Sequence, residues 1–408
     1  MLRLLLKKAL EVPFLIFLLF LKMIQRYFSV RTFISNQSLF GHLALEPEKY
    51  LSAKDVSSPM SEIGFKEKKL PSEIFCFTAP IHKARFTLDL WTFGKKNSQA
   101  NSALVKMWKR KLLVVPSFIV DLLLKANKRF TNPPIVDYRF STLLSAEKNI
   151  DSTRSHLEFS NDEIEKGGKL LLDLGIPTGA PYICIVSREG GSGESQLRNR
   201  SINDFSEMNT EFARRGYAVV RLGGAGSSRL EHTNKQIIDY ANSKYKSAEG
   251  DIFLAANCKF MVSTMTGPDA LALAFRKRVL LLDVPHYGLV FSGTELVTWV
   301  PAVLKRDKER LSLQKVFECG AGWYWNDSHF EDAGLQVFKS SPTEIATYGI
   351  QMLETVDSTE PRFESPLLLR YRTVMQSAMG ELGKSWHGPV RSSVPEEFLS
   401  KNKDWFLS

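Results

Sequence analysis

The sequence predicts a two-domain α/β protein. Its 408 residues can form two full cores, and its 44% apolar and 24% charged residues are ordinary for a globular chain. Between residues 181 and 340, apolar runs with the length of buried strands alternate with helical segments. This alternation is typical of a parallel sheet with crossover helices, whose ligands bind beyond the carboxyl ends of the strands.

Four strands and three helices are expected in this region. The strands cover 182–187, 217–222, 260–264 and 279–284, and the helices cover 202–215, 251–256 and 267–275. Polar residues and glycine lie at the carboxyl ends of the first two strands, where Arg188 follows the first and Arg221 and Gly223 end the second. Two arginines at one sheet edge would suit a diphosphate. Alternatively, Arg188 and Arg221 pair with surface acids.

The stretch 251–269 is the centre of this interpretation. Its strand ends at Thr264, a tight turn contains Thr266, and its second helix opens at Gly267; both threonines can supply capping oxygens. Free N–H groups and the helix dipole make such a junction a natural anion site. An ordinary strand–helix junction is the alternative, and Asp269 in the first turn would compete with a phosphate.

Residues 35–180 are expected to form the first domain. Strands are predicted at 73–78 and 112–115, helices at 101–110 and 117–130, and a helical pattern at 151–173. A cluster of glycine and proline at 175–181 predicts the boundary to the second domain, 181–340. Residues 341–408 are expected to form a helical tail that crosses back towards the first domain.

Two residues of the first domain are candidates for a general base. On a helix, His42 and Glu46 would share a face at i, i+4, although Pro47 predicts that the helix ends there. Either side chain could accept a proton from a hydroxyl group. A helix cap with a surface carboxylate is the ordinary alternative.

The first 34 residues predict a membrane-associated segment. The apolar run 12–21 has basic flanks but is shorter than the roughly 20 residues that a spanning helix needs. We therefore expect an interfacial helix on the cytoplasmic leaflet, with a single span as the alternative. A second basic and apolar cluster at 106–129 also suits an anionic membrane surface. No nucleic-acid-binding pattern is present, so no nucleic-acid partner is expected.

Several cofactor and metal sites are excluded by their missing patterns. The four cysteines are far apart and predict neither a metal site nor a disulfide framework, which indicates a reducing compartment. The glycine-rich turn at 223–226 has Arg229 where a dinucleotide fingerprint needs its third glycine. No Asp-x-Asp occurs anywhere in the chain. We therefore expect no cofactor and no metal.

Six segments together resemble a bacterial family of glycosyltransferases associated with surface-polysaccharide synthesis. They are FGHLALEPEKYL (40–51), QANSALVKMWKRKLLVVP (99–116), YICIVSRE (182–189), RRGYAVVRLG (214–223), DIFLAANCKFMVSTMTG (251–267) and SVPEEFLSKNKDWFL (393–407). The resemblance implies two facing Rossmann-like domains, the GT-B arrangement, with the active cleft between them. The family is distantly similar to fucosyltransferases. The resemblance therefore implies that Arg188, Arg221 and the turn from Thr264 to Gly267 contact a nucleotide sugar.

These expectations combine into one function. A nucleotide-sugar donor would give its sugar to a lipid-linked or membrane-associated glycan acceptor at the cytoplasmic face of the bacterial inner membrane. Glu46 is the first choice of base and His42 the second, and the leaving diphosphate would be stabilised without a metal. Two alternatives stay open: a nucleotide-sugar epimerase or hydrolase of the same architecture, and an inactive membrane-bound component of a polysaccharide complex.

Overall fold

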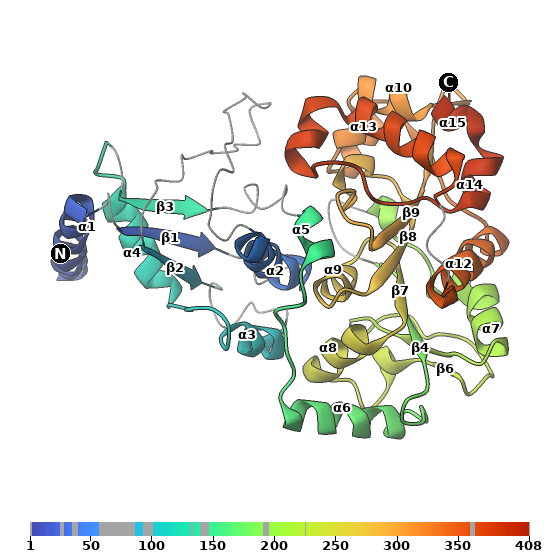
Figure 1. Cartoon of the computed structure of the whole chain (residues 1–408), viewed down its shortest axis with the longest axis horizontal. Helices are drawn as coiled ribbons and strands as arrows, with labels where there is room; N and C mark the ends of the chain where they lie inside the picture. The colour runs from blue at the N-terminus through green and yellow to red at the C-terminus, as the bar shows by residue number, and fades with distance from the viewer. Residues whose placement is uncertain are drawn as a thin grey trace. The chain divides into compact units, whose positions relative to one another are not determined.

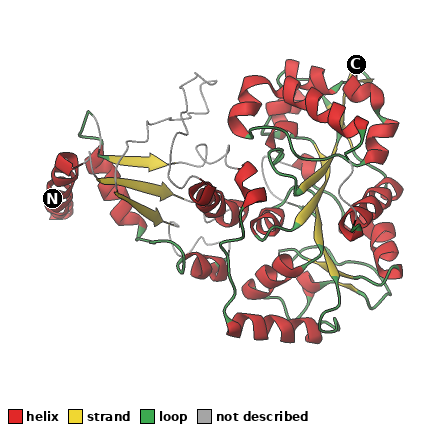
Figure 2. Cartoon of the chain, in the orientation of Figure 1, coloured by secondary structure: helices red, strands yellow, loops and turns green. Residues whose placement is uncertain are grey.

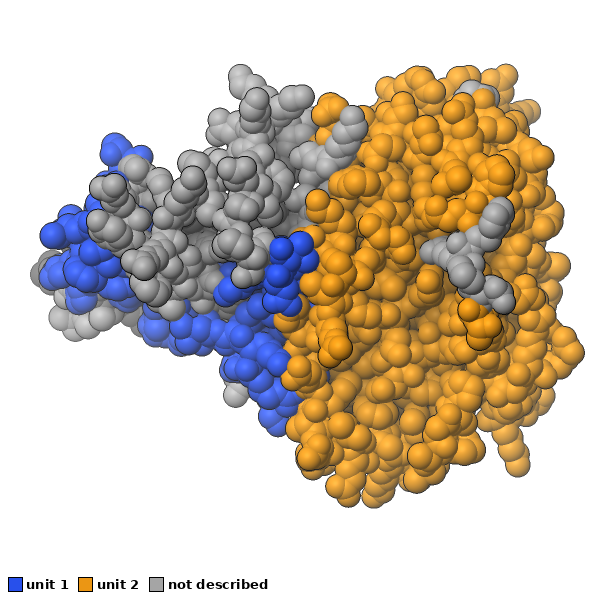
Figure 3. Space-filling model, in the orientation of Figure 1, with its two compact units in different colours: residues 1–144 blue, residues 145–408 orange. Residues whose placement is uncertain are grey.

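The chain folds into two compact units, Met1–Leu144 and Ser145–Ser408, which Figure 3 shows in different colours. A computed structural model describes residues 2–24, 28–34, 40–56, 86–92, 101–131, 134–138, 147–190, 196–224, 226–359 and 364–407. Each unit contains a parallel β-sheet with helices packed against it. The predicted α/β class is therefore confirmed, while the facing arrangement of two domains stays a prediction.

Unit 1 is built on a three-stranded parallel sheet in the order β2-β1-β3 (Figure 1). The strands are β1 (Phe28–Ile34), β2 (Phe86–Thr92) and β3 (Ile135–Tyr138). The helices are α1 (Leu2–Ile24), α2 (Phe40–Val56), α3 (Ser102–Trp108) and α4 (Ser117–Asn127), so the helices expected at 101–110 and 117–130 are confirmed. The strand expected at 73–78 lies outside the described residues.

The N-terminal helix is part of the core of unit 1. Leu18 and Leu21 of α1 are fully buried together with Val30 of the central strand and Leu123 of α4. The side chain of Asn127 adds a polar link from α4 to the sheet, because it donates to the carbonyl of Ile135 at 2.7 Å and accepts from its N–H at 3.1 Å. Residues that the sequence indicates as a separate membrane segment thus supply a core helix and a central strand. No described helix is long and apolar enough to cross a membrane.

Two predicted features of unit 1 differ from the structure. Residues 112–115 connect α3 to α4 with a single β-bridge at Val114 instead of a strand, and Leu113 is 53% exposed. A short apolar run does not by itself distinguish a strand from a connection that partly covers other elements. The helix at residue 40 does not end at Pro47 but continues to Val56. Residues 43–50 are all buried, and this packing outweighs the preference of a residue before proline for extended backbone.

Unit 2 contains a six-stranded parallel sheet in the order β6-β5-β4-β7-β8-β9 (Figures 1 and 2). The strands are β4 (Tyr182–Val186), β5 (Ala218–Arg221), β6 (Ile237–Ile238), β7 (Phe260–Ser263), β8 (Arg278–Val284) and β9 (Val297–Pro301). The helices α7 (Ser206–Arg214), α8 (Ala248–Asn257) and α9 (Gly267–Ala274) connect them. The four expected strands and three expected helices are confirmed, with β6 and β9 added at the edges.

Numbered within this sheet, the strand order is 3-2-1-4-5-6, which is the doubly wound order. Chain direction across the sheet reverses between β4 and β7, so the loops after these two strands diverge to opposite faces. Figure 1 shows α8 and α9 on one face and α7 and α12 (Pro342–Asp357) on the other. The gap at the carboxyl end of β4 and β7 is where such folds bind ligands.

The remaining elements of unit 2 lie around this sheet. A small antiparallel sheet has the order β11-β10-β12, from β10 (Val303–Arg306), β11 (Glu309–Arg310) and β12 (Gln336–Phe338). The helices not yet given are α5 (Glu147–Ser152), α6 (Asn161–Asp173), α10 (Leu313–Glu318), α11 (Asp327–Asp332), α13 (Pro366–Trp386), α14 (Glu396–Lys401) and α15 (Lys403–Leu407).

The division between the units falls at residue 144, not at the glycine and proline cluster near residue 180. Helix α6 packs on α8 so closely that a Cβ on Gly167 would lie 2.1 Å from the ring of Phe253. Gly175 and Gly179 have positive φ values of 78° and 80° and form the turns that lead from α6 into β4. The cluster therefore marks turns inside unit 2.

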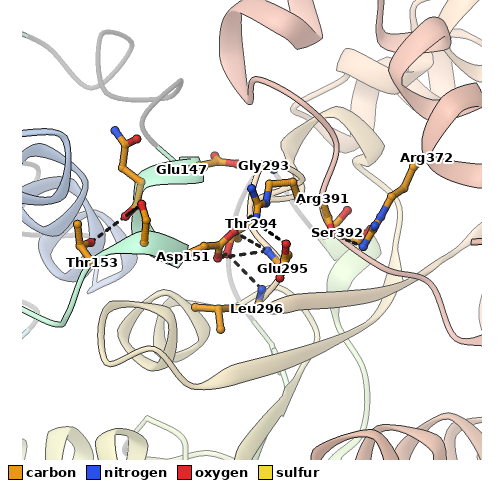
Figure 4. Close-up of polar contacts among 12 residues, drawn as sticks. Glu147, Asp151, Thr153, Gly293, Thr294, Glu295, Leu296, Arg372, Arg391 and Ser392 are labelled. Atoms are coloured by element: carbon orange, nitrogen blue, oxygen red, sulfur yellow. Dashed lines mark hydrogen bonds and ion pairs between the residues drawn. The ribbon is translucent and has the colours of Figure 1, made fainter. Parts of the chain in front are cut away.

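The C-terminal tail packs on unit 2. Helix α12 lies against α7, and α13 lies against α10, α14 and α15. Figure 4 shows how the last extended segment is held: Arg391 pairs with Asp151 of α5 at 3.1 Å and also with Glu295, while Asp151 accepts from the Glu295 N–H at 3.0 Å. The first helix of unit 2, its β8–β9 connection and the tail thus form one polar network.

Candidate functional site

The site begins where β4 and β7 end side by side. Val186 pairs with Ser263 in the last register position, so the residues that follow lie next to each other. The Arg188 N–H donates to Oγ1 of Thr264 at 2.8 Å. Two residues that the sequence predicts at one sheet edge are thus in direct contact.

The turn between β7 and α9 is fixed by Asp269. Its carboxylate accepts from the Ser263 hydroxyl at 3.0 Å and from the Thr266 N–H at 2.6 Å, and it is 4% exposed. Burial raises the pKa of Asp269 to about 6, although both hydrogen bonds act to lower it. The acid that seemed to compete with a bound phosphate is therefore turned into the loop, where it holds the helix start.

This turn also carries backbone strain. Met265 has a φ of 63°, in the left-handed region that costs a residue with a Cβ roughly 1–2 kcal/mol. Strain of this kind persists only where neighbouring contacts hold it, and such residues cluster at ligand sites. The Thr264 hydroxyl, the Thr266 N–H and the start of α9 at Gly267 are the groups that the strained turn positions.

A second arginine, Arg198, joins Arg188 at this edge. It lies in the 3₁₀ turn η3 (Gln196–Arg198), and its Nη1 donates to the carbonyl of Met265 at 2.7 Å. Burial and the neighbouring charge of Arg188 lower the pKa of the Arg198 guanidinium. Within the described part of the chain, neither arginine forms an ion pair, and the Nε atoms of both are buried without a hydrogen-bond partner.

Arg198 was missed by sequence reasoning. It follows no strand directly and belongs to a loop whose position could not be known before the fold. The only sequence feature that could have pointed to it is Arg-Asn-Arg at 198–200, which matches no recognised motif. Its second arginine, Arg200, is 9% exposed and forms an ion pair with Asp283, so that guanidinium holds the fold together.

Arg221 was expected to contact a diphosphate at the carboxyl edge of the sheet. The structure corrects this expectation, because Arg221 pairs through its guanidinium with two acids. It is 1% exposed, and its guanidinium lies between Glu189 at 2.9 Å and Asp239 at 3.0 Å. The ordinary alternative, an arginine paired with acids, describes it, although the pair is buried rather than on the surface. Glu189 follows Arg188 directly. The loop that carries Arg188 therefore also supplies the ion-pair partner of Arg221.

Gly223 lies at the end of β5 and packs against this locked arginine. A Cβ there would lie 3.0 Å from Oγ of Ser227 and 3.4 Å from Cζ of Arg221. The close packing of the guanidinium thus gives a structural reason for glycine at this position. It adds nothing in favour of a dinucleotide turn.

A buried histidine, His286, lies near Arg198. Burial, together with the charge of Arg198, lowers the pKa of His286 to about 4. Its Nδ1 lies 2.9 Å from the carbonyl of Tyr324 and must donate to it, so the buried Nε2 is left as an acceptor. Lys339 adds a further cation nearby, and burial lowers its pKa.

A pocket of unit 2 lies away from these arginines. It has a volume of about 390 Å³ and is lined by Thr298, Tyr348, Gln351, Met352, Glu354, Thr355, Ser365, Leu368, Ser393, Val394, Pro395 and Glu396. This lining contains two glutamates and no lysine or arginine, so it does not suit a phosphate. Arg188 and Arg198, whose guanidinium groups form no ion pair among the described residues, suit an anion better.

In unit 1, the two candidate bases lie together on α2. Nδ1 of His42 is 2.7 Å from Oε1 of Glu46, as expected for i, i+4 on a helix. The side chain of His42 is 33% exposed and that of Glu46 only 4%. His42 is thus the more accessible of the two side chains, and the choice of base between them stays a prediction.

The arginines and the turn of unit 2 are chemically suited to an anion, while a base at His42 or Glu46 of unit 1 stays a prediction. Among the described residues, no group of three or more His, Cys, Asp or Glu side chains is placed to hold a metal ion. Independence of metal nevertheless stays a prediction.

Comparisons with known proteins give only distant similarities. No family model and no curated protein matches the chain. Among solved structures, the family 9 glycosyltransferase of Veillonella parvula aligns over 81% of this chain and 97% of its own, at 11% identity and a TM-score of 0.46.

Two further neighbours are also glycosyltransferases. The iron-containing dodecameric glycosyltransferase TibC of enterotoxigenic E. coli aligns over 63% of this chain and 59% of its own, at 14% identity and a TM-score of 0.30. The E. coli heptosyltransferase WaaC with ADP aligns over 67% and 91%, at 14% identity and a TM-score of 0.31. The chain thus spans less than two thirds of TibC, and all three scores are too low to assign a function.

Proposed function

We propose that this protein is a glycosyltransferase that binds the diphosphate of a nucleotide sugar at the carboxyl edge of the β4–β7 pair. One observation carries the proposal: Arg188 and Arg198 lie together at the switch point of a doubly wound sheet, and neither forms an ion pair among the described residues. Two neighbouring cations repel each other, and a diphosphate bound to both would remove that repulsion.

The groups around the arginines suit a phosphate as well. The Thr264 hydroxyl and the first turn of α9 lie beside Arg188, and Asp269 is directed inward. In a sugar transfer the diphosphate leaves with increased negative charge, so fixed cations and dipoles here would stabilise the transition state. This supports a role in catalysis as well as in binding.

The acceptor hydroxyl needs a base, and we propose His42 with Glu46 as its positioning partner. A histidine held by a carboxylate has a fixed ring orientation, and imidazole is the most common general base in enzymes. A membrane-associated glycan acceptor, and a location at the cytoplasmic face of the bacterial inner membrane, come from the family resemblance and are part of this proposal.

Calorimetric titration with UDP, GDP and ADP tests the donor site. We expect one nucleoside diphosphate to bind, and Arg188→Ala and Arg198→Ala each to weaken it roughly 10- to 100-fold, the value of a charge-assisted hydrogen bond. Arg229→Ala, which removes an exposed arginine of the same unit, should change nothing. Unchanged affinity in both site variants would remove the arginines from the site.

Turnover then separates sugar transfer from the alternatives. A transferase consumes its nucleotide sugar at a rate that depends on added acceptor, whereas an epimerase or hydrolase turns it over alone. An inactive partner protein would bind no nucleotide in the titration. Donor consumption without acceptor, at the same rate as with it, would reject the transferase proposal and keep the binding site.

A further inference from the structure

Helix α1 has two apolar faces, and unit 1 covers only one of them. The inner face carries Leu18 and Leu21, which are at most 2% exposed. The outer face carries side chains that are 53% to 82% exposed: Val12, Ile16, Leu19, Phe20 and Met23. At 3.6 residues per turn these five form one stripe, which we call the outer stripe, opposite the buried pair.

The charge of the protein is concentrated in the same unit. Residues 1–144 contain 23 lysines and arginines against 10 acids, whereas residues 145–408 contain 31 against 34. Unit 1 therefore carries all of the net positive charge. Exposed basic and apolar side chains also occur together on α3, α4 and their connection, where Lys106, Lys109 and Lys128 are exposed and Phe118 is 62% exposed.

We propose that the outer stripe is a docking surface for an anionic lipid bilayer, on which α1 lies flat while unit 1 stays folded. The apolar stripe would contact the acyl chains of the bilayer, and the basic residues of the unit would be attracted to its negatively charged headgroups. Insertion across the bilayer would pull Leu18 and Leu21 out of the core, and no described helix is apolar enough to cross. The exposed stripe needs no such rearrangement.

A second copy of the chain fits the outer stripe less well. From Val12 to Met23 the stripe is about 17 Å long and about 10 Å wide, which is far below the roughly 800 Å² that each partner of a stable complex buries. Two copies would also bring two strongly positive units together. The charge of unit 1 thus opposes self-association and favours an anionic partner.

Vesicle sedimentation of the full-length protein tests this inference independently of the proposed chemistry. We expect binding to vesicles of phosphatidylcholine mixed with phosphatidylglycerol, less binding to pure phosphatidylcholine, and weaker binding at high salt. The triple variant Ile16→Glu, Phe20→Glu, Met23→Glu should bind roughly tenfold or more weakly, because it removes three apolar side chains and adds three negative charges.

A matched variant controls for the added charge. Ile164→Glu, Leu172→Glu and Leu369→Glu replace three exposed apolar residues of unit 2 and should leave vesicle binding unchanged. Circular dichroism and nucleotide affinity should be the same in all three proteins. No binding by the unaltered protein, equal binding to both lipid mixtures, or a dimer that the first variant dissociates would each overturn the proposal. Failure of the donor site would appear only in the nucleotide titration.

Discussion

Arg221 has a structural role, because it is buried in ion pairs with two acids. With Glu189 and Asp239 on either side, its removal leaves two carboxylates without a counter-ion near the core. We expect Arg221→Met to lower the free energy of unfolding by about 3–5 kcal/mol, and Glu189→Gln with Asp239→Asn to restore part of it. Urea unfolding measures both. A stable Arg221→Met protein that has lost nucleotide affinity would return Arg221 to the donor site.

Asp269 should make stability depend on pH in an unusual direction. Its pKa in the folded protein, about 6, is above the ordinary value of 3.8, so the folded state holds the proton more tightly. The stabilisation is complete below about pH 4 and is lost as the pH rises through 6. The shift corresponds to up to about 3 kcal/mol.

The variant Asp269→Asn isolates this effect, because it keeps an acceptor for Ser263 and Thr266 but does not titrate. Unfolding of both proteins at several pH values should show the unaltered protein losing stability relative to the variant between pH 4 and 7. A difference that stays constant with pH would show that the carboxyl group titrates normally.

Sequence reasoning could place Arg188 and Thr264 but not Arg198. The first two follow buried strands directly, and the edge of a parallel sheet brings such residues together whatever the loops do. Arg198 reaches the same point from a loop of its own, and its position depends on a hydrogen bond to the strained Met265 carbonyl. No local pattern encodes that contact.

At the scale of elements, helix α2 carries the prediction for catalysis. His42→Asn keeps the shape of the side chain but cannot accept a proton at neutral pH, so we expect kcat to fall roughly 10²- to 10⁴-fold with unchanged nucleotide affinity. Glu46→Gln should give a smaller loss, because His42 keeps its position. Asp121→Asn on the exposed side of α4 serves as the control. Full activity of the His42 variant would place the base elsewhere.

The helices of unit 2 were easier to predict than those of unit 1. Strands and helices at 182–284 alternate at short intervals, and this alternation is typical of a parallel sheet with crossover helices. In α2, a proline one residue beyond Glu46 predicted an end, yet eight successive buried residues kept the helix intact. The burial of these residues depends on contacts with other elements of unit 1, so a local rule about proline could not predict that the helix continues.

At the scale of the whole molecule, we expect activity without a divalent cation. The sequence has no Asp-x-Asp to hold a metal-bound nucleotide sugar, and two arginines are available for the diphosphate. Turnover should therefore persist in EDTA and gain nothing from manganese or magnesium. Activity that is abolished by EDTA and restored by either ion would contradict this.

The unit boundary was the least predictable feature of the molecule. Glycine and proline at 175–181 suggested a linker, but turns inside a unit use the same residues. The division near residue 144 has no such signal, and α6 joins unit 2 by packing against α8 through Gly167. That contact joins residues far apart in sequence.

The strand order of unit 1 also determines when this unit can fold during synthesis. Of the three strands of this sheet, the central strand β1 is synthesised before its two partners, yet Phe28 pairs with Phe86, and Val30 pairs with Ile135, 105 residues later. The sheet therefore closes only after β3 has been made, and such late pairing leaves apolar segments uncovered in the nascent chain. Helix α1 is synthesised before this interval, and both of its apolar faces are then uncovered. A lipid surface or a chaperone can therefore bind α1 before it packs into the core of unit 1.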